Sequence, residues 1–196
     1  MQIDFILPLM AFALVTSITP GPNNLMLMAS GANFGFRKTV PHMLGVALGF
    51  VAMAFLMGLG LAKVFDAAPW LHTVLSVVSV IYLCWLAWKI ANAAPASARD
   101  SGGRPFTFLQ AAAFQWGNPK AWAMALSAVT VYAPGQSAAA MAAVAVIFGA
   151  VNLPSVGTWC YLGTQLSNVL TSTTRLVWFN RSMAVLLIAS LVPVLL

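Results

Sequence analysis

The chain alternates between long apolar runs and short polar segments. Six runs are long enough to cross a bilayer, which takes about 20 apolar residues in a helix. They extend over residues 4–34, 40–65, 70–92, 106–133, 137–166 and 177–195. The pattern therefore predicts an all-α integral membrane protein with six transmembrane helices.

A polar stretch after the third run divides the predicted spans into three and three. It extends from Asn92 to Arg104 and contains the pair Gly102 and Gly103, which is typical of a flexible connector. We expect a single transmembrane domain, 1–196, made of two repeats and a connector. Their approximate limits are residues 1–92, 93–105 and 106–196.

Two of the predicted spans are interrupted near their middle by helix-breaking residues. The first contains TPGPNN at 19–24, and the fourth contains GNPK at 117–120. Proline removes a backbone donor, and glycine relaxes the chain. Lipid cannot satisfy the backbone groups that a break frees, so such a segment persists only where protein or a water-filled cavity covers it. Two breaks at one depth predict a shared cavity.

The two breaks occupy matching places in the two halves, because Pro119 follows Pro22 by 97 residues. Three spans per half give the halves opposite orientations in the membrane, so we expect two inverted three-helix repeats with broken helices 1 and 4. This arrangement is found in many secondary transporters. Proline kinks also occur in membrane helices for structural reasons alone, and that interpretation stays open.

Lys120 carries a charge near the predicted centre of the bilayer. At 1.5 Å per residue it lies about 20 Å from either end of its span. A cation at this depth costs several kcal/mol unless it is hydrated or paired. The acidic residues Asp4, Asp66 and Asp100 lie near span ends or in the connector. Backbone carbonyls, water or a ligand carboxylate must therefore meet the charge, unless the side chain snorkels to an interface.

We expect the two breaks to form a substrate-binding site. Its predicted members are Pro20, Gly21, Pro22, Asn23, Asn24, Asn118, Pro119 and Lys120. Asparagine amides can orient a ligand ammonium and carboxylate together, although they can equally satisfy backbone groups freed by the breaks. A third polar interruption, in the fifth span, either lines the same cavity or shapes a kink. Its second-tier candidates are Asn152, Ser155 and Trp159.

Composition and charge support the membrane interpretation. Hydrophobic residues make up 61% of the chain and charged residues 6%, against about 25% charged residues in soluble domains. The net charge of +6 does not indicate nucleic acid, because the basic residues are scattered between apolar runs. Lys63 is the only basic residue on the side of the predicted membrane that carries the two termini. Basic residues gather on the cytoplasmic side, so the positive-inside rule puts both termini outside. The opposite side carries Arg37, Lys38, Lys89, Arg99, Arg104, Arg175 and Arg181.

The sequence does not indicate an enzyme, a cofactor or a metal site. Cys84 and Cys160 lie in apolar runs and are interpreted as small apolar side chains. His42 and His72 lie near opposite ends of their spans, so they cannot share a metal. HExxH and GxSxG motifs are absent, and so is any pair of intramembrane carboxylates.

The first break resembles a known family signature. TPGPNN at 19–24, followed by Gly35-Phe36-Arg37 and then Gly45 to Gly49, resembles the LysE/RhtB amino-acid exporters. Asn118-Pro119-Lys120 resembles that family's second signature. The similarity includes WLAWKI at 85–90 and is strongest to the cysteine and O-acetylserine exporter branch. It implies efflux of amino acids or derivatives, driven by the proton gradient, by a six-span protein of the bacterial inner membrane.

The site chemistry narrows the expected substrate. Members of the family often have Asp where this chain has Asn23, so a carboxylate role is not carried over to that position. One cation, several amides and no buried carboxylate favour small neutral amino acids over dibasic ones, since like charges repel strongly in a poor dielectric. The resemblance favours cysteine and O-acetylserine within a class that includes serine, threonine and homoserine. The expected partners are an amino-acid substrate and the lipid bilayer.

Two other classes of protein share the predicted spans. A channel for small polar solutes would have the same broken helices without needing a saturable site at Lys120. An assembly subunit, or a homodimer, would use small residues spaced four apart, such as Gly31 and Gly35, to bring helices together.

Overall fold

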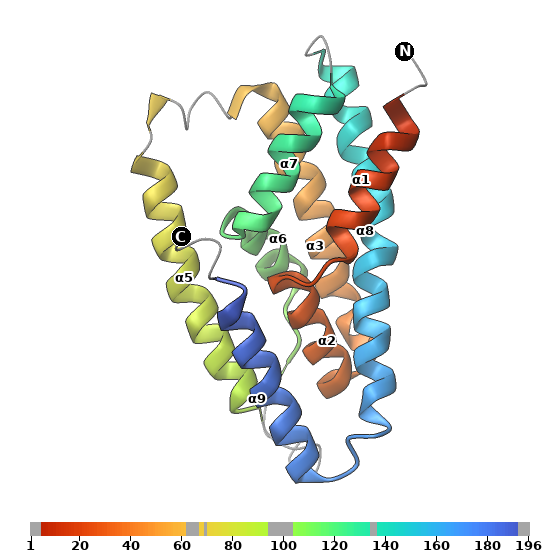
Figure 1. The fold of residues 1–196 in the computed structure, drawn as a ribbon, viewed down its shortest axis with the longest axis vertical. Helices are drawn as coiled ribbons and strands as arrows, with labels where there is room; N and C mark the ends of the chain where they lie inside the picture. The colour runs from red at the N-terminus through yellow and green to blue at the C-terminus, as the bar shows by residue number, and fades with distance from the viewer. Residues whose placement is uncertain (1–4, 62–66, 69, 94–103, 134–136, 192–196) are drawn as a thin grey trace.

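The computed structural model describes residues 5–61, 67–68, 70–93, 104–133 and 137–191. Within these ranges every regular element is a helix (Figure 1), so the all-α prediction is confirmed. The chain begins with α1 (Ile6–Ile18), α2 (Pro22–Phe34), α3 (Phe36–Leu56) and its π-helical extension η2 (Met57–Leu61). It continues with α5 (Trp70–Ala91), α6 (Phe108–Trp116), α7 (Pro119–Tyr132), α8 (Ala138–Ser167) and α9 (Thr173–Ala189).

Three described helices are long and apolar enough to cross a membrane. They are α3 with η2, α5, and α8, over Phe36–Leu61, Thr73–Ala91 and Ala138–Ser167. A fourth candidate is the pair α1 and α2, which are bent by 58° at the break between them. The predicted span 106–133 is divided between α6 and α7, and α9, which covers most of the described part of the predicted span 177–195, has only 17 residues. The count of six spans therefore stays a prediction.

Both predicted interruptions are helix breaks in the structure. α1 ends at Ile18 and α2 begins at Pro22, while α6 ends at Trp116 and α7 begins at Pro119. Each proline occupies the first turn of the second helix, where its missing N–H costs no helical hydrogen bond. Proline thus begins the second segment of each broken helix.

The polar residues of the fifth span do not break its helix. α8 continues through Pro154 from Ala138 to Ser167 without a break. A lone proline removes one helical donor, whereas both breaks also contain a glycine, which relaxes the backbone.

Glycines bring α2 and α8 into close contact. A Cβ placed on Gly31 would collide with the backbone carbonyl of Cys160, and one on Gly163 would collide with that of Met28. In membranes, where apolar side chains gain little by leaving lipid, small residues allow the close backbone packing that holds helices together. α8 also packs on α1 and α3, so it supports both segments of the first broken helix.

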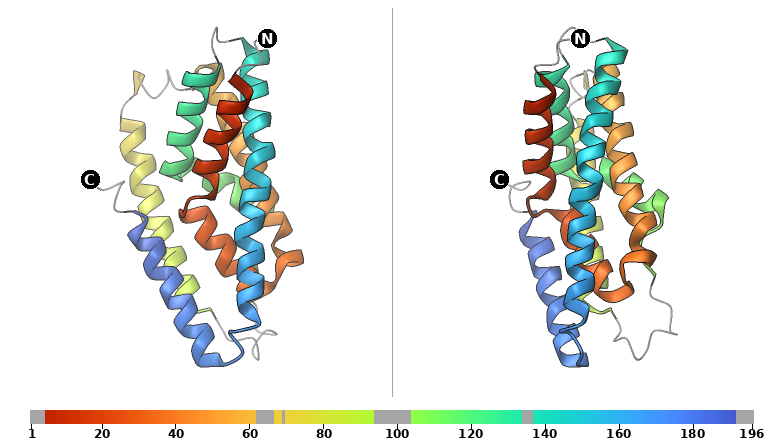
Figure 2. Two further views of the ribbon diagram at one scale, coloured as in Figure 1. Left: turned by 45° about the vertical axis from the view of Figure 1, so that its right-hand side comes forward. Right: turned by 90° about the vertical axis from the view of Figure 1, so that its right-hand side faces the viewer.

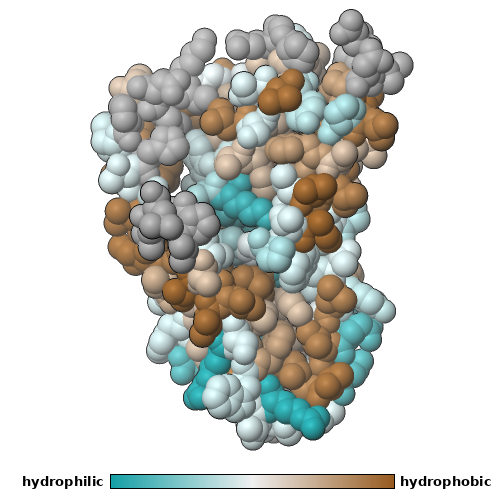
Figure 3. Space-filling model, viewed as in Figure 1, coloured by the Kyte–Doolittle hydropathy of each residue, from teal (hydrophilic) through white to brown (hydrophobic). Residues whose placement is uncertain are grey.

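The two broken helices run in opposite directions. In Figure 1 the chain descends through α1 and then α2, and it rises through α6 and then α7. Figure 1 and the left view of Figure 2 show α5 and α9 packed side by side along one flank. Apolar side chains cover much of the face seen in Figure 3, and α5 exposes large side chains such as Trp70, Ile81 and Trp88.

Candidate functional site

A cavity lies where the two breaks meet. Its polar lining consists of Thr16, Ser17, Asn23, Asn24, Gln115, Asn118, Lys120 and Asn152. Gly21, Pro22, Phe50, Ala121, Met124 and Val156 complete the lining. Figure 3 shows a hydrophilic patch at mid-height, bordered above and below by apolar side chains. The cavity volume of about 20 Å³ admits one or two waters but no amino acid.

The Lys120 ammonium binds the opposite break. Its Nζ donates to the carbonyl oxygen of Thr19 at 2.7 Å, to Thr19 Oγ1 at 2.9 Å and to the carbonyl oxygen of Pro20 at 3.3 Å. These carbonyls follow the C-terminal end of α1, where the helix dipole is negative. The described residues include no Asp or Glu, and backbone carbonyls meet the charge, which is one of the three solutions that the sequence left open.

Gly21 makes room for Lys120. A Cβ at position 21 would lie 2.8 Å from Lys120 Cδ and 3.2 Å from Nζ, closer than side chains pack. The extended backbone of Gly21 can be adopted by any residue, so the glycine is required here for space and not for its φ angle. The lysine of one break thus lies directly against the backbone of the other.

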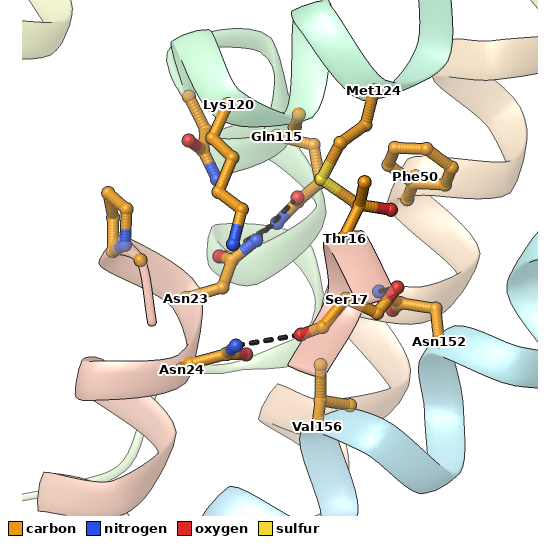
Figure 4. A pocket seen from close by; sticks show the side chains of 14 residues that line it. Thr16, Ser17, Asn23, Asn24, Phe50, Gln115, Lys120, Met124, Asn152 and Val156 are labelled. Atoms are coloured by element: carbon orange, nitrogen blue, oxygen red, sulfur yellow. Dashed lines mark hydrogen bonds between the residues drawn. The ribbon is translucent and has the colours of Figure 1, made fainter. Parts of the chain in front are cut away.

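Asn23 and Gln115 form a reciprocal amide pair in the cavity (Figure 4). Asn23 Nδ2 donates to Gln115 Oε1 at 2.8 Å, and Gln115 Nε2 donates to Asn23 Oδ1 at 3.2 Å. Gln115 is fully buried and also donates to the carbonyl oxygen of Ala111. The sequence analysis missed Gln115, although a glutamine in an apolar run two residues before the second break was a usable signal.

Asn24 and Trp159 satisfy carbonyls that the first break frees. Asn24 Nδ2 donates to the carbonyl oxygens of Ser17 and Thr19, at 2.7 and 2.8 Å. Trp159 Nε1 donates to the carbonyl oxygen of Ile18 at 3.0 Å. In this conformation both side chains therefore stabilise unwound backbone.

Asn118 and Asn152 each have an oxygen without a hydrogen-bond partner. The two residues are 2% and 5% exposed. Asn152 Nδ2 donates to Ser17 Oγ at 3.0 Å, but its Oδ1 has no partner, and neither has Asn118 Oδ1. Ser155, one turn along α8, donates its hydroxyl to the carbonyl oxygen of Val151.

The structure gathers most of the predicted site residues around one cavity. Gly21, Pro22, Asn23, Asn24, Asn118, Lys120 and Asn152 line it. Four predicted residues are not among the lining residues, namely Pro20, Pro119, Ser155 and Trp159. Three polar lining residues were not predicted: Thr16, Ser17 and Gln115.

Histidine and cysteine do not gather at the cavity. His42 is buried against Phe106, with ring centroids 5.1 Å apart, and the side chain of His72 lies outside the described residues. Within the described part of the chain, no three His, Cys, Asp or Glu residues are placed to hold a metal ion. Cys84 and Cys160 are free thiols.

Sequence comparison identifies relatives of this chain. The chain is 32% identical over 131 residues to the cysteine/O-acetylserine efflux protein of Escherichia coli (strain K12). It is 31% identical over 129 residues to the protein of that name from Salmonella typhimurium (strain LT2). Each alignment covers 65% of this chain and 65% of the relative, which is just under two thirds of the relative's length. No solved structure matches the chain.

The family assignment rests on a longer match. The profile of the family described as LysE type translocator matches residues 14–194, a range that includes both breaks and the cavity. Together with the apolar helices, this match indicates a multi-pass membrane protein of a transporter family, not an enzyme family. The chain belongs to the LysE type translocators.

Proposed function

We propose that this chain is a secondary active exporter of small neutral amino acids or close derivatives, of the class of cysteine, O-acetylserine, threonine and homoserine. One observation carries the proposal: the Lys120 ammonium lies at the meeting point of two broken helices, in a cavity lined with amides. The names of the cysteine/O-acetylserine efflux relatives support the substrate class.

In the proposed mechanism, the substrate carboxylate competes with backbone oxygens for Lys120. The ammonium has three N–H donors, and three oxygens of Thr19 and Pro20 accept from them in this conformation. The present contacts have an ionised donor but neutral acceptors, and a carboxylate would add the attraction of its own charge. We expect it to displace the 3.3 Å contact to Pro20 first, because that contact is the longest of the three. Lys120 could alternatively carry the coupled proton, and the experiment on its variants separates the two roles.

Alternating access follows from the same contact. Lys120 joins α7 to the end of α1, so its release would allow the two proposed inverted repeats to move relative to each other. The cavity of about 20 Å³ must expand before an amino acid can enter, which supports a carrier with distinct states over a permanently open pore. The opposite directions of the two broken helices in Figure 1 support the inverted-repeat arrangement.

We further propose six spans in the bacterial inner membrane, with both termini outside. The basic residues of the described segments support this topology, because all six outside the cavity are exposed: Arg37, Lys38, Lys89, Arg104, Arg175 and Arg181. The start of α3, the end of α5 and the start of α9 all lie in the lower half of Figure 1. The predicted basic residues Arg99 and Lys63 lie outside the described residues.

A reporter that is active only after export tests the topology. Fusions at either end of the chain should be active, and fusions after Lys89 or Arg181 should be inactive. Inactive reporters at both termini, with active reporters after Lys89 and Arg181, would reverse the proposed orientation.

Transport by the purified chain in liposomes tests the function. Vesicles preloaded with a mixture of labelled amino acids should release cysteine, O-acetylserine, serine, threonine or homoserine faster than lysine or arginine. Saturation and counterflow should accompany this release, whereas a channel would show neither. Transport without any other protein would exclude a purely structural role. Faster release of lysine or arginine than of every small neutral candidate would contradict the proposed site chemistry.

A further inference from the structure

The carbonyls freed at the first break already have donors. The carbonyl oxygen of Thr16 accepts from Thr19 Oγ1 at 3.0 Å. The following four carbonyl oxygens, of residues 17 to 20, accept from Asn24, Trp159 and Lys120 at 2.7 to 3.3 Å. Unwound backbone in a membrane normally offers its carbonyls to a ligand. In this conformation the protein's own side chains bind all five, so the free acceptors of the cavity lie elsewhere.

Two side-chain oxygens in the cavity lining have no donor. Among the buried polar atoms of the described side chains, Asn118 Oδ1 and Asn152 Oδ1 are the oxygens that lack a hydrogen-bond partner. Both residues are more than nine-tenths buried, and both line the cavity. An unpaired buried acceptor destabilises the folded protein by about 1–3 kcal/mol. Packing alone therefore does not account for either oxygen.

The ordinary structural use of Asn118 does not account for it. Asn118 is the N-cap residue of α7, a position at which an asparagine oxygen usually accepts from the first turn of the helix. It makes no such side-chain hydrogen bond. Asn152 uses only its Nδ2, on Ser17 Oγ. Figure 4 shows Asn152 and Lys120 approaching the cavity from different sides.

We propose that Asn118 Oδ1 and Asn152 Oδ1 accept hydrogen bonds from the α-ammonium group of the exported amino acid. This inference rests on the proposed function and adds the second half of the recognition. An amide oxygen can accept from an N–H group but repels a carboxylate, so the two asparagines and Lys120 select opposite ends of a zwitterion. All the candidate substrates carry the ammonium, whereas O-acetylserine has no donor in its side chain.

The two oxygens also replace the carboxylate that a membrane site would otherwise use for a cation. The described residues contain no Asp or Glu, so no negative side chain among them can pair with the ammonium. Neutral oxygens can accept from the ammonium of a zwitterion while Lys120 binds its carboxylate. They do not attract the second positive charge of a dibasic amino acid as a carboxylate would. A ligand that lacks the amino group should leave both oxygens unpaired and bind less tightly.

The test compares cysteine with two analogues that each lack one charged group. In reconstituted vesicles, the inhibition of labelled-cysteine counterflow is measured with three compounds: cysteine itself, 3-mercaptopropionate, which lacks the ammonium, and 2-mercaptoethylamine, which lacks the carboxylate. Asn118→Leu and Asn152→Leu should each weaken inhibition by cysteine at least about tenfold and leave 3-mercaptopropionate unchanged. The preference for the amino acid over its deaminated analogue should fall by the same factor.

Matched variants separate recognition from folding. Thr158→Val removes a hydroxyl from the exposed face of the same helix, α8, and should leave both inhibition constants at the wild-type values. Asn152→Asp keeps the shape and adds a negative charge, so the preference for cysteine over 3-mercaptopropionate should rise. This opposite sign tests the proposal even where a leucine variant fails to fold.

The outcomes distinguish the inference from the function on which it rests. A wild-type protein without cysteine counterflow would contradict the proposed function. Wild-type counterflow with an unchanged preference in the asparagine variants, or a preference that Asn152→Asp does not raise, would overturn the ammonium site alone. Lys120→Gln should instead reduce the preference for cysteine over 2-mercaptoethylamine.

Discussion

Asn23 and Gln115 exchange two hydrogen bonds across a sequence separation of 92 residues. Asn23 lies in the first turn of α2, directly after the first break, and Gln115 lies in the last turn of α6, directly before the second. The pair therefore connects the two broken helices from within the cavity. A second connection runs from Lys120, just after the second break, to Thr19, in the first break.

Removing one member of the amide pair should destabilise the protein. Gln115→Leu leaves the Asn23 amide partly buried without its partner, and we expect the free energy of unfolding to fall by about 1–3 kcal/mol. The double variant Asn23→Leu/Gln115→Leu should lower the free energy of unfolding by less than the sum of the two single variants, because each single change already breaks the pair. Thermal unfolding in detergent measures the effect, with exposed Asn168→Ala as the control. Additive losses would contradict a coupled pair.

Lys120→Gln should insert normally and lose export. It removes a charged donor from Thr19 and from the substrate carboxylate, and we expect the initial rate to fall by about ten- to a hundredfold. Lys120→Arg should also fail, because the planar guanidinium cannot reproduce the ammonium contacts beside Gly21 and does not release its proton.

The measurement for the Lys120 variants is export rate per amount of membrane protein, with Lys89→Gln at the exposed end of α5 as the charge-matched control. Full export by Lys120→Gln would remove the lysine from the mechanism. If Lys120 carries only the proton, Lys120→Gln should still exchange substrate in counterflow while it loses export driven by the gradient.

Gly21→Ala should act through Lys120. The added methyl would lie 2.8 Å from Lys120 Cδ, so the side chain must withdraw from the Thr19 carbonyl. We expect a loss of export comparable with that of Lys120→Gln, while the folded yield stays nearly normal because the lysine is flexible. Gly157→Ala, whose methyl meets only the terminal carbon of Met43 at 3.3 Å, is the control. Wild-type export by Gly21→Ala would show that the Lys120 contact is dispensable.

Gly31→Ala and Gly163→Ala should destabilise the fold rather than the site. Each added methyl would meet the backbone of the facing helix, which cannot rotate away, so α2 and α8 must separate. Overpacking of this kind costs about 1–3 kcal/mol, and we expect a lower melting temperature in detergent for both variants. The vesicle assay should show near-normal substrate preference in whatever protein folds. An unchanged melting temperature would mean that the two helices can separate at no cost.

The positions of the helix breaks could be predicted because they depend on local chemistry. Proline lacks an N–H and glycine lacks a Cβ, so the segments 19–24 and 117–120 interrupt a helix in almost any surroundings. A single proline does not have this effect, since Pro154 is tolerated inside α8. The family signature was also local, which is why the resemblance and the profile match agree.

The sequence by itself determined that the chain is apolar and helical, that two of its helices break, and that Lys120 lies at one break. It could not decide which polar groups are free, because hydrogen-bond partners are chosen by proximity between distant segments. Only the tertiary structure showed that Asn24 and Trp159 occupy the freed carbonyls, that Gln115 pairs with Asn23, and that two asparagine oxygens are left without donors. The physical reason is that a buried polar group is satisfied by whatever the fold places within about 3 Å of it, a distance that sequence order does not specify.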